Sequence, residues 1–168
     1  MQFLLTLVTM AAAVAATPHS LTRSDPVAVR KVIDGNTIDV RTVGRVRLLG
    51  ITSPKPWAGD PSMAAVAREA RRRLEELVLL RWVRLEREEG VGARSRHAAY
   101  VVREDGLFVN AALVRDGLAR VAAGGEGTAR LEELKRAEAE ARSFRRGLWG
   151  YTAFSTKFPA RGRKKPKS

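Results

Sequence analysis

The stretch that decides the fold is KVIDGNTIDVRTVGRVRLLGITSPK, at residues 31–55. Apolar runs flank a DGN segment at 34–36 and a VG segment at 43–44, and apolar runs on both sides of such turn residues are typical of β-hairpins. Polar side chains gather where the expected strands end, and a strand end can present side chains to a ligand without disturbing the core. The candidate functional positions in this stretch are Asp34, Asn36, Arg47, Thr52, Ser53 and Lys55.

The composition indicates one globular domain with an anionic partner. The chain has 168 residues, of which 45% are hydrophobic, and this is enough for one domain with a buried core. Its formal net charge of +13 favours a polyanionic partner, with nucleic acid ahead of an anionic membrane. The absence of cysteine excludes disulfides, thiolate metal sites and cysteine nucleophiles.

The two ends of the chain differ in composition from the part between them. Residues 3–16, FLLTLVTMAAAVAA, form an apolar run that ends in small residues and is too short to span a bilayer, so we expect residues 1–16 to be a signal peptide. The protein is then expected to be exported (secreted, periplasmic or at the cell surface), with no stable membrane insertion after cleavage. Because no Lys or Arg precedes the run, an uncleaved hydrophobic N-terminus is the alternative. Residues 17–26 are expected to form a tail, and residues 151–168, rich in Lys and Arg, a basic disordered tail.

The order of the remaining elements predicts a sheet with inserted helices. Spacing of three and four predicts a helix after Ser62 as N-cap, alternation predicts a strand over 80–88 with Trp82 in the core, and EDG at 104–106 predicts a second hairpin. The other expected elements are a hairpin arm at 98–102, its partner at 107–109, a helix at 110–115, an extended segment at 118–121, and a last helix from N-cap Thr128 to Gly147 with Phe144 on its buried face. We therefore expect an α+β fold over residues 27–150, with a small barrel of about five strands and three helices, and an OB-fold is the natural candidate. We expect a monomer.

Four motifs carry a family likeness: VIDGNT at 32–37, RVRLLGITSPK at 45–55, EDGLFVNAALVRDGLARV at 104–121 and GLW at 147–149. In these motifs and their order the chain resembles the staphylococcal nuclease (thermonuclease) family, over about residues 27–149. The resemblance implies a five-stranded OB-fold barrel with three helices. In active members it further implies calcium-dependent hydrolysis of phosphodiester bonds in DNA and RNA.

The same resemblance assigns roles to individual positions, and several of them carry the wrong residue for catalysis. Asn36 and Thr52 stand where the family has aspartates that ligate calcium, Ser53 where a threonine carbonyl is a third ligand, and Lys55 where a glutamate is assigned as general base. Arg47 and Arg96 match the two arginines that hold the scissile phosphate, and Asp34 matches an aspartate that acts through water. The tyrosines that usually lie near the nucleotide are replaced by ARS at 93–95 and by Ala123, whereas Trp57 is a candidate for base stacking or for anchoring its loop.

These substitutions change the chemistry that the site can perform. Calcium derives its affinity from anionic carboxylates, and two of them are missing, so no cofactor is expected here although active relatives use calcium. A protonated lysine cannot act as a base, but its charge and reach suit a phosphate. We therefore expect Arg47, Lys55 and Arg96 to bind phosphate. The alternative is a purely structural role, in which Arg47 and Arg96 pair with Asp34, Asp39 or glutamates and only stabilise the barrel.

Three functions follow as hypotheses. The first is an exported pseudo-nuclease that binds DNA or RNA independently of sequence without efficient cleavage. The second is an active DNA/RNA endonuclease that hydrolyses phosphodiesters with a rearranged site. The third is a protein or anionic-polymer interaction module.

Overall fold

The computed structural model of the chain describes residues 20–56, 61–89, 97–123 and 129–150. The expected signal peptide, the basic tail, Trp57, Arg96 and Thr128 lie outside these ranges. Among the described helices, none is both long and apolar enough to cross a bilayer.

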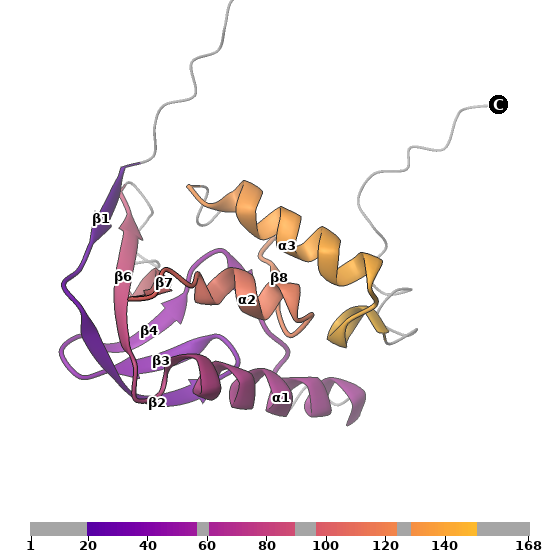
Figure 1. Cartoon of the computed structure of the whole chain (residues 1–168). Helices are drawn as coiled ribbons and strands as arrows, with labels where there is room; N and C mark the ends of the chain where they lie inside the picture. The colour runs from indigo at the N-terminus through magenta and orange to yellow at the C-terminus, as the bar shows by residue number, and fades with distance from the viewer. Residues whose placement is uncertain (1–19, 57–60, 90–96, 124–128, 151–168) are drawn as a thin grey trace, which may run out of the picture.

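A closed barrel of five strands forms the centre of the molecule (Figure 1). Strands β2 (Val27–Asp34), β3 (Thr37–Val40) and β4 (Gly44–Leu48) form an antiparallel meander, and β6 (Trp82–Glu88) pairs antiparallel with β7 (Ala98–Arg103). The barrel closes because β4 pairs parallel with β7 and β2 pairs antiparallel with β6. Side chains that alternate along these strands fill the interior, among them Ile38, Val46, Leu48 and Leu85, all fully buried.

Two small pairings extend the barrel. Strand β1 (Leu21–Arg23) pairs with the far half of β6, on residues 86–88. Strand β5 (Ile51–Thr52) pairs antiparallel with β8 (Arg120–Val121), which joins the end of the fold-deciding stretch to the segment after the second helix. Leu21–Arg23 was expected to belong to a tail, and its pairing with β6 places it in the sheet.

Three helices pack on the barrel, and Figure 1 shows them together on the right of the view with most strands on the left. Helix α1 (Pro61–Val78) lies between β5 and β6 in the chain, α2 (Val109–Arg115) and α3 (Leu131–Ser143) follow β7, and a short 3-10 helix spans Gly147–Gly150. Helix α1 buries Leu74, Leu77 and Val78 in the main core, because these residues recur at three and four. The α+β class and the OB-fold barrel with three helices are thereby confirmed.

Several local predictions were wrong, for reasons of tertiary context. Trp82 is 56% exposed because it faces outward from the barrel, and Phe144 is 66% exposed because α3 ends at Ser143 before it. The second arm of the EDG hairpin is reduced to one bridge between Val102 and Phe108, since Val109 already begins α2. Helix α1 begins at Pro61 rather than after Ser62, and α3 begins at Leu131.

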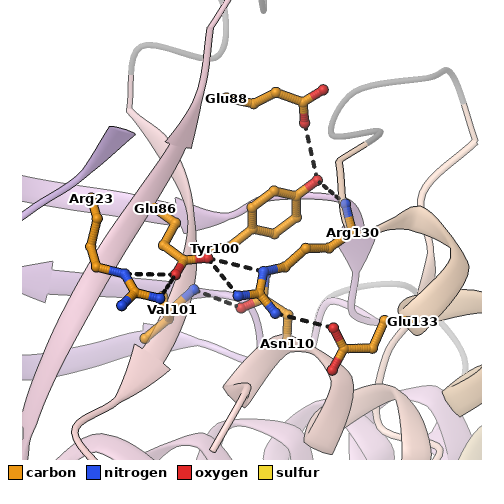
Figure 2. A network of polar contacts seen from close by, with 8 residues as sticks. All are labelled: Arg23, Glu86, Glu88, Tyr100, Val101, Asn110, Arg130 and Glu133. Carbon is orange, nitrogen blue, oxygen red and sulfur yellow. Dashed lines mark hydrogen bonds and ion pairs between the residues drawn. The ribbon is translucent and has the colours of Figure 1, made fainter. Parts of the chain in front are cut away.

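A buried carboxylate ties β1, β6 and the start of α3 together (Figure 2). Glu86 is 2% exposed and accepts hydrogen bonds from both Arg23 and Arg130, with Arg130 Nη2 at 2.7 Å. Arg130 also lies over the ring of Phe108, 4.5 Å from its centre. Burial alone raises the pKa of Glu86, but the two guanidinium groups outweigh it and hold this pKa below its usual value.

Candidate functional site

A β-bulge and a tight turn position the polar residues at the end of β2. Val32 pairs with Ile38 and Asp34 with Thr37, so β2 contains one residue more than β3 over this interval. The backbone N–H of Asn36 donates to Asp34 Oδ1 at 3.0 Å and closes the turn. A Cβ at Gly35 would lie 2.2 Å from Ser53 Oγ, so only glycine allows the turn to approach β5 this closely.

Lys55 reaches back across this turn and places its ammonium between two oxygen atoms. Lys55 Nζ lies 2.5 Å from Asp34 Oδ2 and 3.2 Å from Asn36 Oδ1. Asn36 is 4% exposed, and its amide is held in this orientation because Nδ2 donates to the carbonyl of Ile51 at 3.3 Å. The Lys55 ammonium therefore lies where it neutralises the Asp34 carboxylate.

The electrostatics of Asp34 follow from this arrangement. Burial raises the pKa of Asp34, but hydrogen bonds from Lys55, from the Asn36 backbone and from the Thr37 hydroxyl together lower it below its usual value. A carboxyl with a lowered pKa is ionised at neutral pH and is a weak proton acceptor. The pair contributes stability above the pKa of an unfolded aspartate, about 4, and this contribution is lost as the pH falls through the lower folded pKa.

The other candidate residues surround the turn. Arg47 lies opposite Thr37 across the β3–β4 pairing, and its backbone N–H donates to the His97 carbonyl at 2.7 Å. Thr52 lies opposite Arg120 in the β5–β8 pairing, and Ser53 is buried at 5% exposure with its hydroxyl donating to the Pro54 carbonyl. The register thus brings Asp34, Thr37 and Arg47 into one row across three strands. The role predicted for Arg96 stays a prediction, because Arg96 lies outside the described residues.

The residues present do not fit a calcium ion. Calcium takes six to eight oxygen ligands and depends on carboxylate charge, whereas the two oxygens that converge here, from Asp34 and Asn36, both contact the Lys55 ammonium. Thr52 contributes no charge. Within the described ranges, no group of three His, Asp or Glu side chains is arranged to hold a metal ion.

A lysine substitution tests the central pair. In Lys55→Met the stem is kept but the ammonium is lost, and we expect the pKa of Asp34 to rise because burial is then opposed only by the Asn36 and Thr37 hydrogen bonds. Carboxyl chemical shifts followed against pH by NMR measure this pKa. Lys31→Met, which removes an equal charge from an exposed position on β2, is the matched control and should leave it unchanged. An Asp34 pKa equal in all three proteins would show that the pair does not form in solution.

Sequence reasoning missed two features of this site. It did not anticipate that Lys55 pairs with Asp34, although a lysine at the base position next to a surviving aspartate was a usable signal. It also missed Arg120, which lies next to Thr52 only because β8 returns to β5. Of the two aspartates expected as possible partners of Arg47 and Arg96, Asp34 pairs with Lys55, and Asp39 Oδ2 lies 3.7 Å from Arg30 Nε.

The chain was compared with known protein families and with curated proteins. A search of curated proteins found no match to the chain. The model of the staphylococcal nuclease homologue family matches residues 45–151, which include most of β4, the Lys55 segment, all three helices and β6 to β8. This match covers more than half of the 168 residues. The chain therefore belongs to the staphylococcal nuclease homologue family.

Proposed function

We propose that this protein binds the phosphate backbone of nucleic acid without cleaving it efficiently. The observation that carries the proposal is the position of the Lys55 ammonium, 2.5 Å from Asp34 and 3.2 Å from Asn36. By the family resemblance, Lys55 stands at the position of the general base and Asn36 at that of a calcium ligand. The Lys55 ammonium thus occupies the place where catalysis needs a proton acceptor and a divalent cation.

The expected effect of losing both the general base and the metal ion supports the absence of efficient cleavage. Removing a general base costs about 10²–10⁴ in rate, and removing metal-ion stabilisation of the transition state adds several kcal/mol to the barrier. Asp34 is the carboxylate left at the turn, and its lowered pKa makes it a poor substitute base. The active-nuclease hypothesis therefore cannot rely on Asp34 as its base.

Phosphate binding is supported by the cations that surround the turn. Arg47 lies in the same row as Asp34, and Arg120 lies opposite Thr52. Arginine forks match phosphate oxygens in pairs, whereas Lys55 acts as a point charge that Asp34 partly neutralises. We infer that Arg47 and Arg96 provide the main phosphate contacts and that Lys55 assists them.

Purified protein is expected to show no calcium-stimulated hydrolysis of single-stranded DNA or RNA, and to bind both with an affinity that falls steeply with salt. Gel assays with calcium or with a chelator, together with anisotropy titrations, measure the two properties. Cleavage that requires calcium and disappears in Arg47→Ala would overturn the proposal, whereas cleavage unchanged in Arg47→Ala would come from a contaminant. Absence of binding at low salt would favour the protein-interaction hypothesis.

Export is a second part of the proposal and is supported by the apolar run at residues 3–16. N-terminal sequencing of protein recovered outside the cytoplasm is expected to begin near Thr17. A mature chain that retains Met1, recovered only from the cytoplasm, would contradict it.

A further inference from the structure

The outer surface of the barrel carries a row of cations that the site does not use. Along β3 and β4 the buried residues Ile38, Val40, Val46 and Leu48 alternate with Asp39, Arg45 and Arg47, which face outward. Lys31 pairs with Asp39, and Asp39 pairs with Arg45, so these three residues form one row across β2, β3 and β4. This row lies on the same face as the Asp34–Thr37–Arg47 row.

A second β-bulge adds another cation to this row. Val29 pairs with Val40 and Lys31 with Asp39, so Arg30 and Lys31 together stand opposite one residue of β3. Both are exposed, and Arg30 Nε lies 3.7 Å from Asp39 Oδ2. One carboxylate therefore faces three cations, and in the part of the chain that the structure describes Lys31 and Arg45 make no ion pair.

Trp82 lies on the same face at its β6 end. Val27 pairs with Val83, and both contact the main core, so the next pair along, Ala28 and Trp82, faces outward. Ala28 precedes the Arg30–Lys31 bulge on β2, which places it about 7 Å from Arg30 along the strand. The indole is 56% exposed and is thus an aromatic surface beside a group of cations. We call Trp82, Arg30, Lys31 and Arg45 the outer strand face.

The helices do not share this excess of positive charge. Helix α1 carries four arginines and three glutamates, and its Arg71 and Arg72 pair with Glu75 and Glu76 one turn later. Helix α3 carries more carboxylates than cations. Residues 27–48 hold five cations against two aspartates, and one of these, Asp34, is paired with Lys55. Strands β2 to β4 therefore carry a larger excess of positive charge than α1 or α3.

We propose that the outer strand face binds single-stranded nucleic acid, with one base stacked on Trp82 and the adjoining phosphates on Arg30, Lys31 and Arg45. This rests on the proposed function and extends it from the former catalytic turn to a surface that leads away from it. A base can stack on an exposed indole only when it is unpaired, so a single strand fits this face better than a duplex. Arg47 connects the two regions because its row adjoins that of Arg45.

The experiment compares a fluorescent 20-nucleotide oligothymidylate with an abasic oligomer of equal length, which keeps the phosphates but has no base to stack. Trp82→Thr preserves strand propensity and should weaken oligothymidylate binding about 5- to 150-fold, the effect of about 1–3 kcal/mol for one stacked base. Binding of the abasic oligomer should not change. Trp82→Phe retains a ring and should bind nearly like the parent, and melting temperatures confirm that each variant is folded.

A charge-matched pair of double variants tests the cations. Lys31→Ala with Arg45→Ala should weaken both oligomers and reduce the slope of log K against log salt by about 1.4, or about 0.7 for each lost phosphate contact on a single strand. Arg71→Ala with Arg72→Ala changes the net charge equally but on α1, and should leave the slope unchanged.

The outcomes separate this inference from the proposed function. If the parent binds the oligomer and Trp82→Thr binds it equally tightly, the proposal that the outer strand face binds nucleic acid is wrong, while the proposed function stands. If the parent binds neither oligomer at low salt, the proposed function itself fails. If Trp82→Thr weakens the abasic oligomer as much as oligothymidylate, no base stacks on Trp82. If Trp82→Thr instead abolishes binding to phosphatidylserine–phosphatidylcholine vesicles and leaves oligomer binding unchanged, the outer strand face binds membranes and the inference is wrong.

Discussion

Replacing Asn36 and Thr52 by aspartate and Lys55 by glutamate is expected to create calcium binding that the parent chain lacks. The three changes remove the ammonium that lies 2.5 Å from Asp34 and add three carboxylates around the same turn, which shifts the local charge by four units toward negative. Calcium affinity rises with the number of anionic oxygens, so the gain should be large enough for calorimetry to detect. Calcium-dependent cleavage of single-stranded DNA should appear together with calcium binding. We expect its rate to exceed that of the parent by a factor of about 10²–10⁴ or more.

Two controls assign this gain to the site. Lys55→Met alone removes the ammonium without adding a carboxylate, and it should bind no calcium. The triple variant with Arg47→Ala should still bind calcium but lose the cleavage, because Arg47 is inferred to hold phosphate and not metal. A triple variant that remains folded and binds no calcium would show that the residue-by-residue assignment from the family resemblance is wrong.

The barrel could be predicted from sequence because its signals are local. The apolar runs around DGN and VG have the period of strands, and α1 has the period of a helix, so the order of elements and the OB-fold class followed. Trp82 shows where such reasoning fails. Its strand was expected correctly, but its placement in the core ignored the alternation of that strand, in which Val83 and Leu85 face the core and Trp82 therefore faces outward.

The site could be predicted only as a set of residue types. The substitutions at Asn36, Thr52 and Lys55 were visible in the sequence, as was the retention of Asp34 and Arg47. The direction in which Lys55 points was not, because it depends on the turn that Gly35 allows and on the bulge that aligns Asp34 with Thr37. For the same reason Arg120 was missed, since its proximity to Thr52 arises from the return of β8.

The second large effect concerns stability and the carboxylate of Figure 2. Glu86→Gln keeps the shape of the side chain but removes a charge that is 2% exposed and bonded to Arg23 and Arg130. Breaking a buried ion pair from one side costs about 3–5 kcal/mol, and we expect about 3 kcal/mol because both guanidiniums keep access to water. In a domain of this size that lowers the melting temperature by roughly 6–12 °C. Glu132→Gln is the control, since this exposed glutamate pairs with Lys135 on the surface of α3, and it should leave the melting temperature nearly unchanged.

The pH dependence distinguishes lost charge from lost packing. The folded pKa of Glu86 lies below its unfolded value, so its contribution is fully present above about pH 5 and disappears as the pH falls through the folded pKa. A protonated glutamate resembles glutamine in shape and charge, so the difference in unfolding free energy between parent and Glu86→Gln should be about 3 kcal/mol at pH 7 and shrink steadily below about pH 4. Urea unfolding at a series of pH values measures it. A difference that stays constant across this range would mean that Glu86 acts through packing, and that Arg23 and Arg130 do not hold β1 and α3 to β6 by charge.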